Sequence, residues 1–262
     1  MEAKIWIMRP LNPLFLAVSA AFLLLLALAS LALRGRCENT RRWVLVSACT
    51  VTFAGFFAYK YCLSVDAAYA VITARTGGFD WWAELPMHLC NVNMILIPIA
   101  VLRRSRPLMC FGFFLGPLGA LMALLMPSNG FDGYSLLLPR MLGYYGTHFM
   151  IVIEGLALVT FGFFRPRFSD LPRTILTALL ICFGAFCVSA LLRAAGLSAT
   201  ANYFYSLETE GNFLLEMFRR WIPLPFLYLM PCVAILGVYM AVVTAGFALA
   251  DRLRGRNAPA GR

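Results

Sequence analysis

Runs of about 20 mostly apolar residues recur along this chain, and they restrict its fold more than any other feature. A helix of that length crosses a hydrocarbon core of ~30 Å. Because lipid offers no hydrogen-bond partners to the backbone, each run is expected to be helical. The sequence predicts an all-α polytopic integral membrane bundle of about seven transmembrane helices, at residues 11–33, 43–63, 85–102, 107–126, 140–164, 173–195 and 226–250.

Composition agrees with a membrane protein. The chain is 61% hydrophobic and 13% charged, whereas soluble domains carry about 25% charged residues. Its first apolar run, 14–33, exceeds the ~7–15 residues of a signal-peptide core, and more arginines follow it than precede it, so a retained helix is expected. No repeat, low-complexity tract or linker is visible, which predicts one membrane domain over residues 1–262.

Arginines gather in alternate loops, which predicts the orientation. The basic sets are Arg34, Arg36, Arg41 and Arg42; Arg103, Arg104 and Arg106; Arg165, Arg167 and Arg173; and, in the tail, Arg252, Arg254, Arg256 and Arg262. The second loop offers only Arg75 beside three acidic residues, Asp66, Asp80 and Glu84. Since basic loops stay cytoplasmic, the N-terminus is expected outside and the C-terminus inside.

The same pattern explains the formal net charge of +10. Most basic residues stand where topology and anionic headgroups favour them. A nucleic-acid partner would also favour a basic chain, but no basic helix face or recognition motif accompanies the charge. The expected partner is therefore a membrane lipid rather than a nucleic acid.

The most polar of the apolar runs begins with residues 84–93, which read Glu-Leu-Pro-Met-His-Leu-Cys-Asn-Val-Asn. Polar side chains are costly in a membrane and persist there mainly for function. Eight cysteines are spread over the chain, and most are interpreted as small buried hydrophobes rather than a disulfide framework. Cys90 differs because of its polar neighbours and is the candidate nucleophile.

The chain has two histidines, His88 and His148. The third and fifth runs should both enter from the outside. At about 1.5 Å per residue, Cys90 then lies roughly 9 Å and His148 roughly 12 Å below the outer ends of their runs. This matched depth predicts a Cys–His pair across two helices, in a pocket open to the outer leaflet. An imidazole that accepts the thiol proton would activate Cys90 for attack on an acyl carbonyl.

His88 is a poorer base for Cys90. In a regular helix, two residues differ by about 200° in direction, so the two side chains would point to nearly opposite faces. His88 is instead expected to share a face with Glu84 and Asn91, with Glu84 holding it through an i,i+4 contact. Asn93 shares the Cys90 face and could orient His148 or donate to an oxyanion.

Three further patterns carry predictions. Gly112, Gly116, Gly119 and Ala120 recur at helical spacing and predict a close-packing face. Residues 212–221 are amphipathic, which suits either a helix in the membrane interface or a loop helix covering the bundle. Glu154, about 120° from His148, is expected to bond to a neighbouring helix rather than join the pair.

The order of motifs resembles the YwaF family of bacterial membrane proteins, which is related to eukaryotic transmembrane protein 164. The matching stretches are Leu85–Cys90, Gly112–Ala120, Met126–Ser128, Gly146–His148 and Asn202–Tyr205. The resemblance implies acyl chemistry on phospholipid, with Cys90 as nucleophile, His148 as its partner, and the cytoplasmic (inner) membrane of a bacterium as the location.

The sequence leaves several alternatives open. The preferred function is a phospholipid acyltransferase or lipid (thio)esterase that forms an acyl thioester and needs no cofactor. A transporter whose polar cluster lines a path is the second reading, although no repeat symmetry supports it. A metal site of His88, His148 and Cys90 is the third, and it lacks a standard zinc spacing. Arg140 could meet a lipid phosphate or act as a snorkelling anchor, and Asn202 is a candidate substrate-binding residue.

Overall fold

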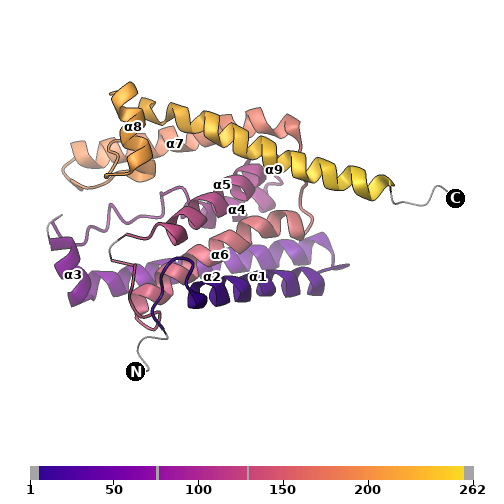
Figure 1. Ribbon diagram of the computed structural model, residues 1–262, viewed down its shortest axis with the longest axis horizontal. Helices are drawn as coiled ribbons and strands as arrows, with labels where there is room; N and C mark the ends of the chain where they lie inside the picture. The colour runs from indigo at the N-terminus through magenta and orange to yellow at the C-terminus, as the bar shows by residue number, and fades with distance from the viewer. Residues whose placement is uncertain (1–5, 75–76, 129, 257–262) are drawn as a thin grey trace.

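The computed structural model describes residues 6–74, 77–128 and 130–256, and within these ranges the regular structure is helical (Figure 1). Arg75 and Arg262, which entered the orientation prediction, lie outside the described residues. The predicted all-α membrane bundle is confirmed. Six helices are long and apolar enough to cross a membrane: α1 (Pro13–Ala32), α2 (Glu38–Val65), α5 (Arg106–Leu125), α6 (Pro139–Thr160), α7 (Leu171–Ala194) and α9 (Met230–Arg256).

Shorter elements connect these helices. They are α3 (Ala67–Thr73), α4 (Asn93–Leu102), α8 (Phe213–Trp221) and the short 3-10 turns η3 (Phe168–Asp170), η4 (Tyr203–Tyr205) and η5 (Leu227–Leu229). Six of the predicted runs agree with long helices to within a few residues at most boundaries. Prolines at the first or second position help to fix where α1, α5, α6 and α7 begin, because their missing N–H is not needed there.

The predicted third helix, 85–102, is wrong over its first half. Residues 85–92 form successive turns, and α4 begins only at Asn93. The Asn93 side chain donates to the carbonyl of Leu89 at 2.7 Å, which is the acceptor that a helix would offer to the Asn93 N–H. That N–H bonds to Cys90 instead, at 3.1 Å. Local side-chain bonds of this kind compete with helix formation, and Pro86 removes another donor.

Contacts between loops show that the chain alternates between two ends of the bundle. At the arginine end (loops 33–37, 103–105 and 161–170), Arg106 Nε lies 2.6 Å from Asp170 Oδ1 and Arg165 Nε lies 2.7 Å from Asp251. At the opposite α3 end, Arg140 Nη1 lies 2.7 Å from Asp66 Oδ2. The segment 77–102 therefore makes the third crossing of the bundle, first as turns and then as α4.

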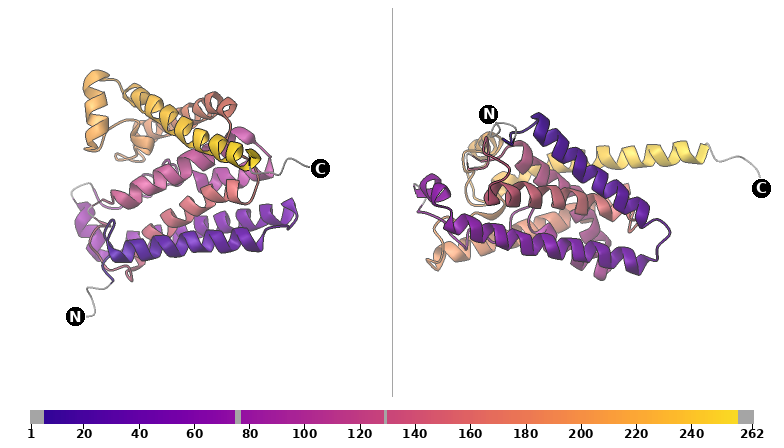
Figure 2. Two further views of the ribbon diagram at one scale, coloured as in Figure 1. Left: turned by 45° about the vertical axis from the view of Figure 1, so that its right-hand side comes forward. Right: turned by 90° about the horizontal axis from the view of Figure 1, so that it is seen from below.

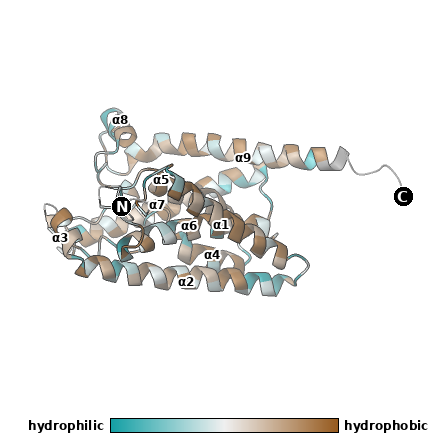
Figure 3. Ribbon diagram, turned by 60° about the horizontal axis from the view of Figure 1, so that its bottom comes forward, coloured by the Kyte–Doolittle hydropathy of each residue, from teal (hydrophilic) through white to brown (hydrophobic). Residues whose placement is uncertain are grey.

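The centre of the bundle is built by α2, α4, α5 and α6, while α1 and α9 present largely apolar surfaces to the outside (Figure 3). The predicted glycine face of α5 is confirmed. A Cβ on Gly112 would lie 2.8 Å from Ile97, one on Gly116 would lie 3.3 Å from Asn93, and one on Gly119 would lie 3.1 Å from Leu89. Close approach of α5 is what encloses the irregular third crossing.

Candidate active site

His148 lies on α6, three turns from the α3 end, and is buried with 6% exposure. Its Nδ1 lies 2.7 Å from the backbone carbonyl of Tyr144. A carbonyl only accepts hydrogen bonds, so this contact assigns the proton to Nδ1. The other ring nitrogen, Nε2, is then left with a free lone pair and can act as a proton acceptor.

Cys90 lies in the turns of the third crossing and is also buried, with 8% exposure. Its Sγ is 3.6 Å from His148 Nε2 and 3.5 Å from Asn91 Oδ1. Within the described residues, the backbone N–H groups of Cys90 and Asn91 donate to no backbone carbonyl. The structure thus brings together the two residues that the depth argument paired, in a geometry that lets the imidazole accept the thiol proton.

Aromatic rings wall the imidazole. The Tyr144 ring lies 4.5 Å from the His148 ring and stacks on Phe131 at 4.2 Å. The Tyr144 hydroxyl donates to the carbonyl of Ala123 at 2.7 Å. These contacts fix the turn of α6 whose carbonyl sets the tautomer of His148, and they keep bulk water away from it.

His88 and Glu84 do not make the predicted i,i+4 contact. The Glu84 carboxylate pairs with the buried ammonium of Lys60 on α2, and the His88 ring packs edge-on against Tyr203, with centroids 5.6 Å apart. The prediction assumed a regular helix, which this segment does not form. Sequence reasoning missed Lys60, although a lysine inside the apolar run 43–63 was a visible signal.

The two asparagines also differ from expectation. Asn91 is buried and accepts from the Cys90 thiol rather than sharing a helical face with His88. Asn93 does not orient His148, because Tyr144 and Cys90 occupy both ring nitrogens. The Asn93 amide donates to Leu89, and its Oδ1 is buried without a hydrogen-bond partner. The role of Asn93 is to shape the turn that carries Cys90.

Arg140 is neither an exposed phosphate ligand nor a snorkelling anchor, because its side chain is buried and paired with Asp66. Asn202 ties its own loop together: its amide donates to Glu208 O at 2.8 Å and Glu210 Oε1 at 2.7 Å. Glu154 accepts a hydrogen bond from Thr52 on α2 at 2.5 Å, so its predicted bond to a neighbouring helix is confirmed.

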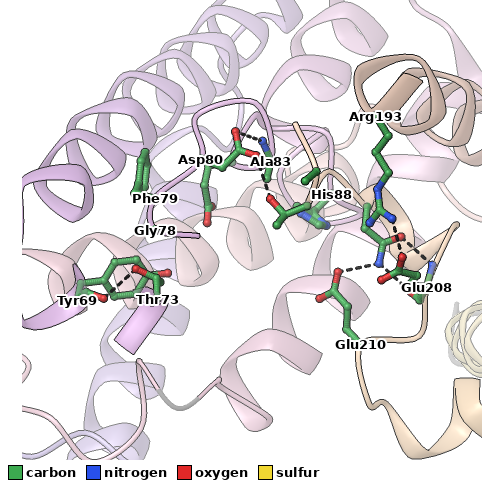
Figure 4. A pocket seen from close by; sticks show the side chains of 14 residues that line it. Tyr69, Thr73, Gly78, Phe79, Asp80, Ala83, His88, Arg193, Glu208 and Glu210 are labelled. Atoms are coloured by element: carbon green, nitrogen blue, oxygen red, sulfur yellow. Dashed lines mark hydrogen bonds and ion pairs between the residues drawn. The ribbon is translucent and has the colours of Figure 1, made fainter. Parts of the chain in front are cut away.

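A cavity of about 500 Å³ opens at the α3 end (Figure 4). Its lining includes His88, Arg193 and four acidic residues, Asp80, Glu84, Glu208 and Glu210. Cys90 and His148 do not line this cavity, and the predicted pocket around the pair stays a prediction. His88, two residues before Cys90, is the part of the lining closest to the pair in sequence.

Two carboxyl groups of this cavity, those of Asp80 and Glu210, have pKa values shifted in opposite directions. Burial acts to raise the pKa of Asp80, but hydrogen bonds from Ser198 and Thr200 outweigh it and hold that pKa below its ordinary value. Burial raises the pKa of Glu210, against the opposing hydrogen bond from Asn202. The cavity is therefore polar and acidic, unlike the apolar surroundings of Cys90 and His148.

Among the residues that the structure describes, no group of three His, Cys, Asp or Glu side chains is placed to hold a metal ion. The alternative of a His88–His148–Cys90 metal site thus has no geometric support. His88 faces Tyr203, whereas His148 faces Cys90.

The family of this chain follows from its similarity to a known protein family. The model of the TMEM164 family matches residues 8–249. This chain belongs to the TMEM164 family. The predicted relation to transmembrane protein 164 is confirmed, and the relation to the bacterial YwaF proteins stays a prediction. No curated protein and no solved structure matches the chain. The match covers five of the six long helices in full and α9 as far as residue 249, together with Cys90 and His148, and the chain is a multi-pass membrane protein of this family.

Proposed function

We propose that this TMEM164 family member is a membrane-embedded acyltransferase or lipid (thio)esterase that uses Cys90 as nucleophile and His148 as general base. The observation that carries the proposal is the 3.6 Å contact between Sγ and Nε2, with Nδ1 held by the Tyr144 carbonyl. A base oriented by a third group and facing a nucleophile is the arrangement that covalent catalysis requires.

The reaction follows from this geometry. His148 Nε2 takes the thiol proton, and the thiolate attacks the ester carbonyl of an acyl lipid. As the carbon–oxygen bond breaks, the imidazolium returns the proton to the leaving alcohol, and the acyl group remains on Cys90 as a thioester. A second alcohol, or water, then attacks the thioester while His148 takes its proton, and as the carbon–sulfur bond breaks the imidazolium returns that proton to the Cys90 thiolate. The first outcome is transfer and the second is hydrolysis.

The backbone N–H groups of Cys90 and Asn91 are the candidate donors to the oxyanion. Both adjoin Sγ along the chain and donate to no backbone carbonyl of the described residues, so they would be available to the oxygen of a carbonyl carbon bonded to that sulfur. Donors fixed by the turn need no rearrangement when charge develops on the oxygen. The Asn93 amide is less suited, since it is already bonded to Leu89.

The orientation and the substrate belong to the same proposal. The α3 end would face outward, because the arginine-rich loops lie together at the other end, and the pair would work in the outer half of a bacterial inner membrane. The substrate would be a phospholipid or another acyl lipid whose acyl chains enter between the helices.

Acyl labelling tests the proposal. Purified protein in phospholipid bicelles is incubated with a radiolabelled acyl phospholipid, and label bound to protein is measured before and after hydroxylamine, which cleaves thioesters. Wild type should accumulate hydroxylamine-labile label, whereas Cys90→Ser should hold no thioester. Cys187→Ser is the matched control, because Cys187 is exposed on α7. Full turnover by Cys90→Ser would contradict the proposal and favour the transporter alternative.

A further inference from the structure

The helix α8 lies across the α3 end of the bundle, roughly perpendicular to α9 (Figure 2, left). Its outward face is apolar. Phe213 is 84% exposed and Trp221 is 68% exposed, and at about 100° per residue these two lie within about 80° of each other on the helix. A helix at the end of a membrane bundle that turns aromatic residues outward, transverse to the spans, matches the geometry of an interfacial helix.

The opposite face of α8 is fixed to the protein. Leu215 and Phe218 are buried against Tyr228 and Leu229. The two charged residues of this face also turn inward: Glu216 accepts from the Thr209 hydroxyl, and Arg219 donates to the carbonyl of Leu207 at 3.4 Å. Glu216 and Arg219 therefore direct their charges toward the protein, and Arg220 is the exposed charged residue of α8.

The hydrogen-bond partners of Glu216 and Arg219 belong to the loop 202–210. This loop forms one wall of the acidic cavity. Asn202, Glu208 and Glu210 of this loop line the cavity (Figure 4). The Tyr203 hydroxyl donates to the carbonyl of Trp82, and the rings of Tyr203 and Tyr205 face His88. The loop therefore joins α8 to the segment that leads into Cys90.

The backbone of this loop is strained, so it depends on its clamps. Phe204 and Tyr205 have φ angles of 57° and 54°, a region that is unfavourable for bulky residues and persists only where the surroundings impose it. The clamps come from η5 and the residue before it: the Tyr228 hydroxyl donates to Tyr205 O, and Phe226 N donates to Ser206 O at 2.7 Å. The α8 helix packs directly against this same region.

We propose that α8 is an interfacial membrane anchor, and that its seat in the lipid headgroup region holds the loop 202–210 closed over the approach to Cys90. The partner is the lipid surface itself: the aromatic face enters the boundary between headgroups and chains, and exposed Arg220, at the edge of that face, meets lipid phosphate. This inference extends the proposed function, because it assigns the bilayer the task of shaping the path to Cys90.

Two measurements on the full chain test the anchor and its coupling to the loop. The first is tryptophan fluorescence in phosphatidylcholine vesicles whose acyl chains carry bromine either near the headgroup or near the methyl end. The component that disappears in Trp221→Phe reports Trp221. It should be quenched more by the shallow bromines. Equal lack of quenching by both, or crosslinking of α8 to a second copy, would overturn the anchor.

The second measurement is the rate at which a water-soluble maleimide modifies Cys90, located by mass spectrometry. Phe213→Ser/Trp221→Ser should raise this rate about tenfold, which corresponds to ~1.4 kcal/mol. Phe168→Ser is the matched control, because Phe168 is 53% exposed at the arginine end. An unchanged rate in the α8 variant would overturn the coupling. Neither measurement requires turnover, so failure here is distinguishable from failure of the acyl-enzyme proposal.

Discussion

The two residues of the Cys90–His148 pair are held by different kinds of backbone. His148 lies within α6, a helix of 22 residues whose ladder is complete around it. Cys90 lies in turns, between a proline and the start of α4. The helix fixes the tautomer of His148 through one of its own carbonyls, and the turns leave the N–H groups of Cys90 and Asn91 without a backbone acceptor in the described part of the chain. In the proposed function, a regular helix would thus orient the base and irregular turns would present the nucleophile.

The comparison also shows what supports the irregular backbone. Turns at membrane depth are tolerated only where protein covers them, and here the cover is the glycine face of α5. A change on α6 should therefore affect either chemistry or helix packing, whereas a change in the turns should affect the placement of Cys90 with little effect on stability.

The largest expected effect is that of His148→Ala on acyl-enzyme formation. General-base catalysis contributes about 10²–10⁴-fold, so the rate of hydroxylamine-labile label should fall by that factor while the protein remains folded in bicelles. His88→Ala is the matched control, because this histidine faces Tyr203 rather than Cys90. The labelling rate of this variant should fall much less. Equal losses would remove the distinction between the two histidines.

The second largest expected effect is on stability and comes from the packing of α6 against α2. A Cβ on Gly143 of α6 would lie 2.1 Å from the Tyr59 Cβ on α2, so Gly143→Ala must push the two helices apart at a cost of about 1–3 kcal/mol. Gly146→Ala, three residues along, meets nothing within 4 Å and should be neutral or slightly stabilising. Thermal unfolding in detergent measures both. Similar melting temperatures for the two variants would contradict the tight α2–α6 contact.

The helices could be predicted from the sequence, whereas the turns could not. The long helices follow from apolar length, since lipid permits few other structures. The pairing of Cys90 with His148 agrees with their contact, although the helical rise assumed for Cys90 does not hold over residues 85–92. The turns at 85–92 were missed because their cause is one side-chain bond, from Asn93 to Leu89, which hydropathy does not register. The roles of Arg140 and Glu84 were missed because their partners, Asp66 and Lys60, are distant in sequence.

A smaller effect should separate stability from reactivity in the turns. Asn93→Ala loses a hydrogen bond worth about 1 kcal/mol but frees the Leu89 carbonyl for the Asn93 N–H and adds a better helix former, so stability should change by less than ~1 kcal/mol. The turn that presents Cys90 should meanwhile wind toward helix, and acylation should slow about tenfold, equivalent to ~1.4 kcal/mol.

The Asn93→Leu variant sharpens this test, because it roughly preserves the size of the side chain and removes the amide donor without adding a charge. Its acylation rate should fall as far as that of Asn93→Ala. If either variant acylates at the wild-type rate with unchanged stability, the bond to Leu89 does not position Cys90. Stability is followed by thermal unfolding and acylation by the same hydroxylamine assay.

The smallest effect concerns pH and the start of α6. Burial acts to raise the pKa of Asp66, but the hydrogen bond and charge of Arg140, with N–H groups of α3, hold it below its ordinary value of 3.8. A lowered carboxyl pKa stabilises the folded state fully above 3.8, and this contribution is lost as the pH falls through the lowered pKa. Because the Asp66 side chain is 26% exposed, solvent screening keeps the contribution small.

Thermal unfolding from pH 5 downward should show a modest loss of stability below about pH 4, and Asp66→Asn/Arg140→Met should reduce the dependence of stability on pH. The slope that remains belongs in part to Asp80, whose pKa is lowered too. An undiminished slope in the double variant would show that the ion pair does not couple α6 to the α3 end.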